Sequence, residues 1–200
     1  MCGRYLVITE SEIIQMQEIF EKIGRDLKVK RPGDFENEEE IFPGSFAPVI
    51  TSDGNRSELR LMKWGFSIPN SKRSVINARS ETAPSKNLFK KPLSENRCII
   101  PSLGFFEWKK IPGGNSKEKF FIRSDDSSLF LMAGIFRKNG DNEEFVIMTM
   151  PAMKEIGHIH DRMPLFILED QIGKWLENAD QINSLMANIF TAQGITATKV

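Results

Sequence analysis

The stretch PGGNSKEKFFIRSDDSSLFLMAGIFRKNGDNEEFVIMTM, residues 112–150, alternates turn-forming segments with short apolar runs. The turn signals occupy residues 112–115, 124–128 and 139–142, where glycine, asparagine, serine and aspartate gather. Between them lie the apolar runs 120–123, 129–136 and 145–150. Short strands at this spacing are typical of antiparallel hairpins in a barrel or a sandwich.

Further short apolar runs at 59–66, 98–100, 105–108 and 164–168 extend this strand-rich region in both directions. Helices are expected at the two ends. Thr9-Glu10-Ser11-Glu12 is a capping-box pattern that precedes apolar residues at helical spacing, and Gly24 ends that helix. Residues 170–176 and 180–190 predict two closing helices, and the proline- and glycine-rich residues 28–57 predict an irregular segment.

The composition is that of a globular protein of 200 residues, with 40% hydrophobic and 10% aromatic residues. We expect one domain over residues 1–200, since no linker or repeat divides the chain. No stretch approaches the ~18 apolar residues of a membrane span, and the start lacks a secretory signal. The only cysteines, Cys2 and Cys98, cannot build a disulfide framework, which favours a cytoplasmic location.

The net charge is zero, but the charge is distributed unevenly. Residues 56–119 carry 14 Lys and Arg against 5 Asp and Glu, while acidic runs occur at 34–40 and 141–144. A basic stripe on a neutral protein predicts a groove that follows phosphates. The alternative is a solvated charged face with no ligand.

Cys2 directly follows the initiator Met1. Aminopeptidases remove Met1 when residue 2 is small, and the chain would then begin with an amine and a thiol on adjacent carbons. Their ordinary pKa values lie near ~8 and ~8.5, so both groups are partly nucleophilic at neutral pH. Such an aminothiol can attack acyl groups or close a thiazolidine ring with an aldehyde. The alternative is a frayed terminus with no special chemistry.

Polar residues also interrupt the expected strands. Asn77 and Arg79 share one strand face, and Glu107 shares a face with Phe105 among aromatic neighbours, where we expect a raised carboxyl pKa. Thr149 lies in a further apolar run. His160 stands in His158-Ile159-His160-Asp161-Arg162, beside an arginine. The alternatives are a strand-edge salt bridge for Glu107 and a structural role for His160.

Five ordered blocks together resemble the SOS-response-associated peptidase (SRAP) family: MCGRY (1–5), WGFSIP (64–69), NARSET (77–82), RCIIPSLGFFEW (97–108) and IHDRMP (159–164). The resemblance implies an α+β fold with strongly curved, barrel-like antiparallel β-structure and flanking helices. It also implies crosslinking to abasic sites in single-stranded DNA. This chain departs from the family pattern at Phe106, where tyrosine is common, and in residues 42–48, which lack the family's tyrosine–asparagine pair.

The resemblance implies a role for each of four catalytic residues. His160 would protonate the sugar ring oxygen, and Cys2 would form a Schiff base with C1′ and then close a thiazolidine ring. Glu107 would move protons, and Asn77 would hold the amine or the sugar. The implied DNA-contacting residues, through phosphates for the arginines and stacking for the tryptophans, are Arg4, Trp64, Arg79, Trp108, Thr149 and Arg162. The alternative for both tryptophans is a place in the core.

Two other functions remain open from the sequence. Cys2 with His160 and Glu107 fits a thiol hydrolase or peptidase, including one that removes its own Met1. Cys2, Cys98, His158 and His160 are nominal zinc ligands, but their spacing lacks a C-x-x-C-type pattern and argues against a metal site. We expect no cofactor, no metal, no membrane partner and a monomer that binds single-stranded DNA with abasic sites.

Overall fold

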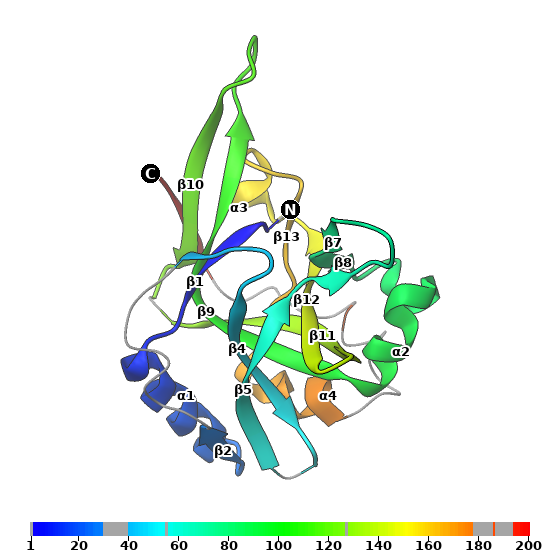
Figure 1. Ribbon diagram of the computed structural model, residues 1–200. Helices are drawn as coiled ribbons and strands as arrows, with labels where there is room; N and C mark the ends of the chain where they lie inside the picture. The colour runs from blue at the N-terminus through cyan, green and yellow to red at the C-terminus, as the bar shows by residue number, and fades with distance from the viewer. Residues whose placement is uncertain (1, 30–39, 55, 127, 178–185, 187–193) are drawn as a thin grey trace.

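A computed structural model describes residues 2–29, 40–54, 56–126, 128–177, 186 and 194–200. Five strands form a closed barrel, because the order β11-β12-β5-β4-β9 is completed by pairing of β9 with β11. These strands are β4 (Phe46–Ser52), β5 (Arg56–Trp64), β9 (Arg97–Lys110), β11 (Phe130–Asn139) and β12 (Asn142–Pro151). The α+β, barrel-like fold expected from the sequence is therefore confirmed (Figure 1).

Strand β9 extends the barrel into an outer layer. It pairs with β1 (Arg4–Val7) and β10 (Lys117–Ser124), besides the barrel strands β4 and β11. β1 then adds β3 (Glu40–Ile41), and β10 adds β14 (Ile195–Lys199). The far end of β9 and the start of β10 form a long hairpin that projects beyond the barrel (Figure 1).

Parallel pairings also contribute to the sheet. β12 runs parallel to β5, and also to β8 (Asn77–Arg79), while β2 (Asp26–Val29) runs parallel to β5. β13 (Arg162–Pro164) adds to β12 in the antiparallel sense, and β6 (Phe66–Ser67) pairs with β7 (Ser74–Val75) in a separate small sheet. Hairpin spacing in the sequence does not predict the parallel contacts, because they join distant segments.

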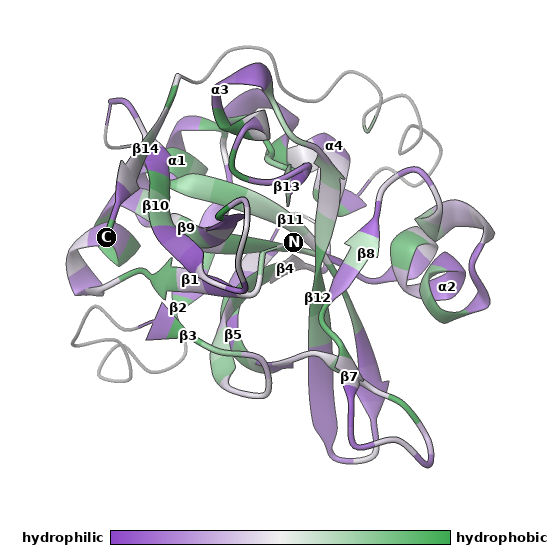
Figure 2. Cartoon of the chain, turned by 90° about the horizontal axis from the view of Figure 1, so that it is seen from above, coloured by the Kyte–Doolittle hydropathy of each residue, from purple (hydrophilic) through white to green (hydrophobic). Residues whose placement is uncertain are grey.

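Aromatic side chains fill the barrel. Trp64 lies fully buried, stacks on Phe145 at 6.3 Å between ring centroids, and meets Tyr5 edge-on at 5.2 Å. Its indole Nε1 donates to the Ile76 carbonyl oxygen at 3.0 Å, which satisfies the one polar atom of the ring. Viewed from above, β11 and neighbouring strands are largely hydrophobic near the centre, with hydrophilic segments prominent outside (Figure 2).

Short helices flank the barrel: α1 (Glu10–Lys22), α2 (Asn87–Glu95), α3 (Lys154–Gly157) and α4 (Ile172–Glu177), with 3₁₀ turns at Ala83–Ser85 and Glu169–Gln171. The capping box predicted for α1 is confirmed, since the Thr9 main-chain N–H donates to Glu12 at 2.8 Å. Arg97 joins α2 and α4 to β9 by donating to the Leu93 carbonyl at 2.9 Å and to the Trp175 carbonyl. None of the described helices is long and apolar enough to cross a membrane.

Two expectations about local structure differ from the fold. Residues 28–57 are not wholly irregular, because Phe46–Ser52 forms barrel strand β4, in which Pro48 pairs opposite Leu61. In the sequence, Pro48 indicates irregular structure, although the residues around it from Ala47 to Ile50 are apolar and buried, as in a strand. The two runs expected at 98–100 and 105–108 belong to one strand, β9. The closing helix expected at 180–190 lies outside the described residues, except for Met186.

Gly104 is required where β9 passes between β1 and β10. A Cβ atom there would lie 2.5 Å from the Phe121 ring and 2.6 Å from the Ile122 carbonyl oxygen, which cannot move without breaking the β9–β10 ladder. We therefore expect Gly104→Ala to destabilise the protein by ~1–3 kcal/mol, measured by chemical denaturation. Gly157→Ala is the matched control, since a Cβ there meets nothing within 4 Å. Equal stability of the two variants would contradict this account.

Candidate active site around Cys2

A cleft of about 600 Å³ opens between the projecting β9–β10 hairpin and the segment that follows α3. Glu107 and Trp108 line it from β9, and His160 lines it from the segment before β13. The remaining lining residues are Lys109, Lys110, Lys117, His158, Ile159 and Asp161. Two groups suited to proton transfer thus share a cleft with three lysines.

Cys2 lies buried immediately before β1 and next to Glu107. Its Sγ donates to the Arg4 carbonyl oxygen at 3.6 Å. Burial raises the pKa of the Cys2 thiol well above its usual range, and the negative charge of Glu107 raises that pKa further. The thiol therefore stays protonated at neutral pH and needs a base before it can act as a nucleophile.

Asn77 holds the main chain of Cys2. The parallel pairing of β8 with β12 sets Asn77 opposite Ile147, and its Nδ2 donates to the Cys2 carbonyl oxygen at 2.9 Å. The Asn77 Oδ1 is buried and accepts no hydrogen bond from the described residues. An amide oxygen left in this way can accept a hydrogen bond from an amine or a hydroxyl group that enters the site.

Glu107 is 2% exposed at the point where β9 leaves the barrel. Burial raises the pKa of its carboxyl group, and the positive charge of His160 acts in the opposite direction. The raised pKa expected from the aromatic surroundings is confirmed, with desolvation as the main cause. A carboxyl group with a raised pKa keeps its proton to a higher pH than an exposed glutamate, and its carboxylate is a stronger base.

His160 is oriented by the residues that follow it. The Arg162 main-chain N–H donates to His160 Nδ1 at 3.0 Å, and Asp161 Oδ1 lies 2.9 Å from the same nitrogen. The two contacts require opposite states of Nδ1: a lone pair for the amide donor, and a proton for the carboxylate. With the amide contact made, a neutral imidazole carries its proton on Nε2.

Arg162 and Thr149 are buried side by side beneath this segment. The Arg162 guanidinium forms a two-pronged ion pair with Glu81 and donates to the Thr149 carbonyl oxygen at 2.7 Å. Thr149 Oγ1 lies 3.4 Å from the Ala78 carbonyl oxygen. Both side chains are committed to internal contacts, so this structure gives them a supporting position rather than an exposed surface for phosphates.

Arg4 lies at the side of the cleft between two aromatic rings. Its guanidinium carbon is 4.4 Å from the Phe42 ring centroid and 5.1 Å from that of Trp108. Glu40 pairs with Arg4 at 3.3 Å and also with Lys119. A cation stacked on two aromatic rings is well suited to contact a phosphate while the rings contact bases.

The two remaining DNA-contact candidates differ in exposure. Arg79 is exposed at the end of β8, and no ion pair to another described residue holds it. Trp64 is fully buried and belongs to the barrel core, which is the alternative foreseen for it. Trp64 is therefore not in a position to stack on bases, whereas Trp108 lines the cleft.

The nominal zinc ligands do not form a cluster. Cys98 is buried in the barrel wall, where its Sγ is close to Gly134. In the part of the chain that the structure describes, no group of three or more His, Cys, Asp or Glu side chains is arranged to hold a metal ion.

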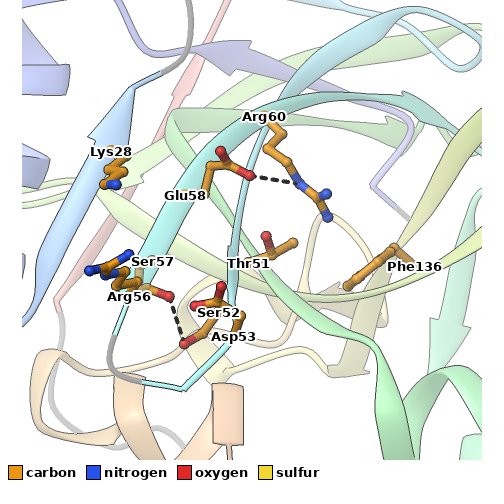
Figure 3. Close-up of a pocket in the computed structure, with 9 residues that line it drawn as sticks. All are labelled: Lys28, Thr51, Ser52, Asp53, Arg56, Ser57, Glu58, Arg60 and Phe136. Atoms are coloured by element: carbon orange, nitrogen blue, oxygen red, sulfur yellow. Dashed lines mark hydrogen bonds and ion pairs between the residues drawn. The ribbon is translucent and has the colours of Figure 1, made fainter.

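A second cavity, of about 280 Å³, lies at the hairpin end of β4 and β5 and includes Phe136 (Figure 3). Two of its charged side chains, Arg60 and Glu58, face one another. Arg60 lies 3.8 Å from Glu58 and 3.4 Å from Glu143, and its guanidinium is 5.7 Å from the Phe136 ring. This cavity contains none of the candidate catalytic residues, so we assign the function to the cleft beside Cys2.

Sequence reasoning missed the hairpin lysines Lys109, Lys110 and Lys117 and the partners of Arg4, namely Glu40 and Phe42. The lysines fall inside the basic block at 56–119, so the charge count contained their signal without locating them. Glu40 and Phe42 carried no signal, because they reach Arg4 through the β1–β3 pairing of distant segments.

Comparison with known proteins agrees with the family resemblance that the sequence motifs indicate. Residues 1–200 match the family model described as SOS response associated peptidase (SRAP). The chain is 30% identical to "Abasic site processing protein YobE" of Bacillus subtilis (93% of this chain, 88% of that protein) and 30% identical to "Abasic site processing protein YedK" of Escherichia coli (97% and 86%). A crystal structure from Bacteroides thetaiotaomicron has the same fold, with a TM-score of 0.78 and 24% identity, covering 100% of this chain and 92% of the other.

The buried carboxyl of Glu107 yields a test on stability. Its pKa is higher in the folded than in the unfolded chain, so the folded state keeps a proton that the unfolded state has lost, and stability falls as pH rises through this window. Glu107→Gln removes this loss. We expect the variant to be more stable than the wild type at pH 7, with Tm rising by ~2–4 °C per kcal/mol gained.

The stability difference should be smallest below pH ~4 and should grow until Glu107 is ionised in the folded protein. Thermal melts across pH 3–8 measure it, and the effects of other titrating groups cancel between the two proteins. Glu118→Gln is the control, because Lys199 lowers the pKa of this partly exposed carboxyl group and no stabilisation is expected. A Glu107→Gln difference that shrinks as pH rises would contradict the assigned direction.

Proposed function

This chain belongs to the SOS response associated peptidase (SRAP) family, and we propose that it binds single-stranded DNA and links covalently to abasic sites through Cys2 after removal of Met1. Relatives named as abasic site processing proteins support the abasic site as its substrate. The observation that carries the assignment to Cys2 is the hydrogen bond from Asn77 to the Cys2 carbonyl, because it fixes residue 2 beside Glu107.

The first step is opening of the sugar. An abasic deoxyribose is mostly a closed hemiacetal, and only the open form has an aldehyde at C1′. His160 Nε2–H donates a hydrogen bond to the ring oxygen as the ring C–O bond breaks, and the proton of the C1 hydroxyl passes through water to that oxygen, so that the aldehyde and a free hydroxyl form. A neutral imidazole that carries its proton on Nε2 in the cleft suits this hydrogen bond, which stabilises the charge that develops on the ring oxygen.

The second step is attack by the N-terminal amine. The amine nitrogen adds to C1′ to give a carbinolamine, which loses water to give an iminium ion. Protonated Glu107 gives its proton to the oxygen at C1′ while it takes one from the attacking nitrogen. It then gives a second proton to the leaving hydroxyl and becomes the carboxylate, a sequence that its raised pKa favours. Asn77 Oδ1 accepts a hydrogen bond from the amine during this exchange.

The third step is ring closure by the thiol. The Cys2 sulfur adds to the iminium carbon and loses its proton, so the whole sequence consumes an aldehyde and an aminothiol and releases one water. Because burial keeps the thiol protonated, its proton passes to a base as the C–S bond forms, and Glu107 is the neighbouring carboxylate. The raised thiol pKa also makes the amine, rather than the thiol, the first nucleophile.

DNA binding is assigned to the charges around the cleft. Lys109, Lys110 and Lys117 line it from the hairpin and suit a backbone of phosphates. Arg79 adds an exposed cation from β8. Trp108, with Arg4 over its ring, offers a surface on which a base can stack.

The second candidate function is hydrolysis of a peptide bond by Cys2, as the family description suggests. Glu107 and His160 supply the acid and base that such a reaction needs. A thiol hydrolase depends on an accessible thiolate, however, and the Cys2 thiol is buried with a raised pKa. We therefore rank crosslinking above hydrolysis.

The aminothiol gives the sharpest test of the proposed function. We expect processed protein to form a heat-stable adduct with single-stranded DNA that carries one abasic site, without added borohydride, because the thiol closes the imine into a ring. Cys2→Ser should lose this adduct yet remain trappable by borohydride through its free amine. Denaturing gels and intact mass spectrometry measure both products.

A variant that retains Met1 provides the discriminating control. It keeps the thiol but blocks the amine, so it should form neither the stable adduct nor the borohydride-trapped one. Crosslinking by the Met1-retaining protein at the wild-type rate would refute the thiazolidine route. Turnover of a peptide by that protein would favour the hydrolase.

The lysines of the hairpin make a prediction about salt. Replacement of Lys109, Lys110 and Lys117 by glutamine should weaken binding to every single-stranded sequence. It should also reduce the slope of log K against log salt by about 2, since each lost phosphate contact removes ~0.7. Fluorescence anisotropy between 50 and 300 mM salt measures this slope. The control replaces three exposed lysines outside the cleft, Lys22, Lys138 and Lys174, and an equal loss of slope there would contradict the assignment to the hairpin.

A further inference from the structure

A carboxylate from another part of the chain holds in place the segment that carries His160. Glu81 follows β8 in the chain, and its two oxygens bind the two terminal nitrogens of Arg162, with Nη2–Oε2 at 2.9 Å. This ion pair holds the pKa of Glu81 at about 2, so the pair persists throughout the neutral range. Two-pronged pairing of this kind fixes direction as well as distance.

The guanidinium of Arg162 has little room to move. Besides Glu81, it donates to the Thr149 carbonyl at 2.7 Å, and its side chain is only 9% exposed. The Arg162 main chain is also fixed, because β13 pairs with β12 and sets Arg162 opposite Pro151. Both the side chain and the main chain of Arg162 are thus fixed in position.

The main-chain N–H of this fixed residue is the donor to His160 Nδ1, at 3.0 Å. Asp161 Oδ1, at 2.9 Å, competes for the same nitrogen and favours a proton there. If the Arg162 amide moved away, Nδ1 would carry the proton of the neutral imidazole and donate it in a hydrogen bond to Asp161. Nε2 would then carry no proton. The position of the amide therefore selects the tautomer.

We propose that Glu81 is a positioning residue for His160: by binding the Arg162 guanidinium, it keeps the Arg162 amide on His160 Nδ1 and so keeps the imidazole proton on Nε2. The inference rests on the proposed function, in which this Nε2–H donates a hydrogen bond to the sugar ring oxygen. Glu81 does not line the cleft, and its effect on the reaction is transmitted through Arg162.

Other charged groups also face His160 and enter the design of the test. Asp161 precedes Arg162 on the same segment, and Glu107 faces His160 from β9. The cleft also contains His158 after α3 and the hairpin lysines Lys109, Lys110 and Lys117. None of these groups changes in a Glu81 variant, so an effect on His160 reports on the ion pair.

The test compares Glu81→Gln with Glu177→Gln. Both replace a carboxylate that binds an arginine close to it, but Glu177 binds Arg25, and neither residue of that pair lines the cleft. A general loss of stability appears in both variants, whereas an effect on His160 appears in the first alone. Arg162→Lys, which keeps the charge and loses the fork, tests the same ion pair from its other side.

The readout is the imidazole tautomer, measured by long-range ¹H–¹⁵N NMR at a pH where the ring is neutral. The chain has two histidines, so His158 serves as the internal reference. We expect the wild type to be the Nε2–H tautomer, and Glu81→Gln and Arg162→Lys to show a substantial share of Nδ1–H. The double variant should add nothing to either single one, because both disrupt one ion pair.

Single-turnover crosslinking under saturating DNA supplies the second readout. Glu81→Gln should react ~10-fold more slowly, less than the ~10²-fold loss expected for removal of this hydrogen-bond donor in His160→Ala. An unchanged His160 tautomer in both Glu81→Gln and Arg162→Lys would overturn the proposal. If the tautomer shifts as expected while the wild type forms no crosslink, the proposed function fails and the positioning of His160 by Glu81 stands.

Discussion

The structure depends on the pairing of one long strand, β9, with four others. Its fourteen residues pair with β11 and β4 to close the barrel, and then with β1 and β10 outside it. Glu107 and Trp108 lie where β9 passes from barrel to hairpin, so the same ladder that stabilises the core fixes the wall of the cleft. The register of β1 on β9, with Arg4 opposite Phe106, brings the start of the chain to that point.

The site places two buried ionisable groups next to each other. Glu107 is buried with a raised pKa, and Cys2 beside it is buried with a raised thiol pKa, so each neutral form is favoured. The other carboxylate that is buried among the described residues, Glu144, instead accepts hydrogen bonds from Ser67 and pairs with Arg137, and its pKa is lowered. Two neighbouring groups that hold protons tightly, one of which lines the cleft, are more typical of proton transfer than of structural support.

The features that the sequence predicted correctly depend on residues that are close together in the chain. The capping box before α1, the β9–β10 and β11–β12 hairpins and the raised pKa of Glu107 are each predicted from neighbours in the chain, and the structure confirms them. β10 and β11 follow one another in the chain, but both pair with β9 and not with each other. The parallel pairing of β12 with β5 and β8 has no local signature, and neither has the pairing of Arg162 with Glu81. Trp64 illustrates the same limit, since its motif marks the family but not whether the ring faces the core or the solvent.

The unequal burial of the tryptophans has a spectroscopic consequence. Of the three in the chain, Trp64 and Trp175 are fully buried, and only Trp108 lines the cleft. A ligand that enters the cleft changes the polarity around one indole and leaves the other two in their apolar surroundings. The protein therefore carries an intrinsic fluorophore at its candidate site, whose emission reports occupancy without any label.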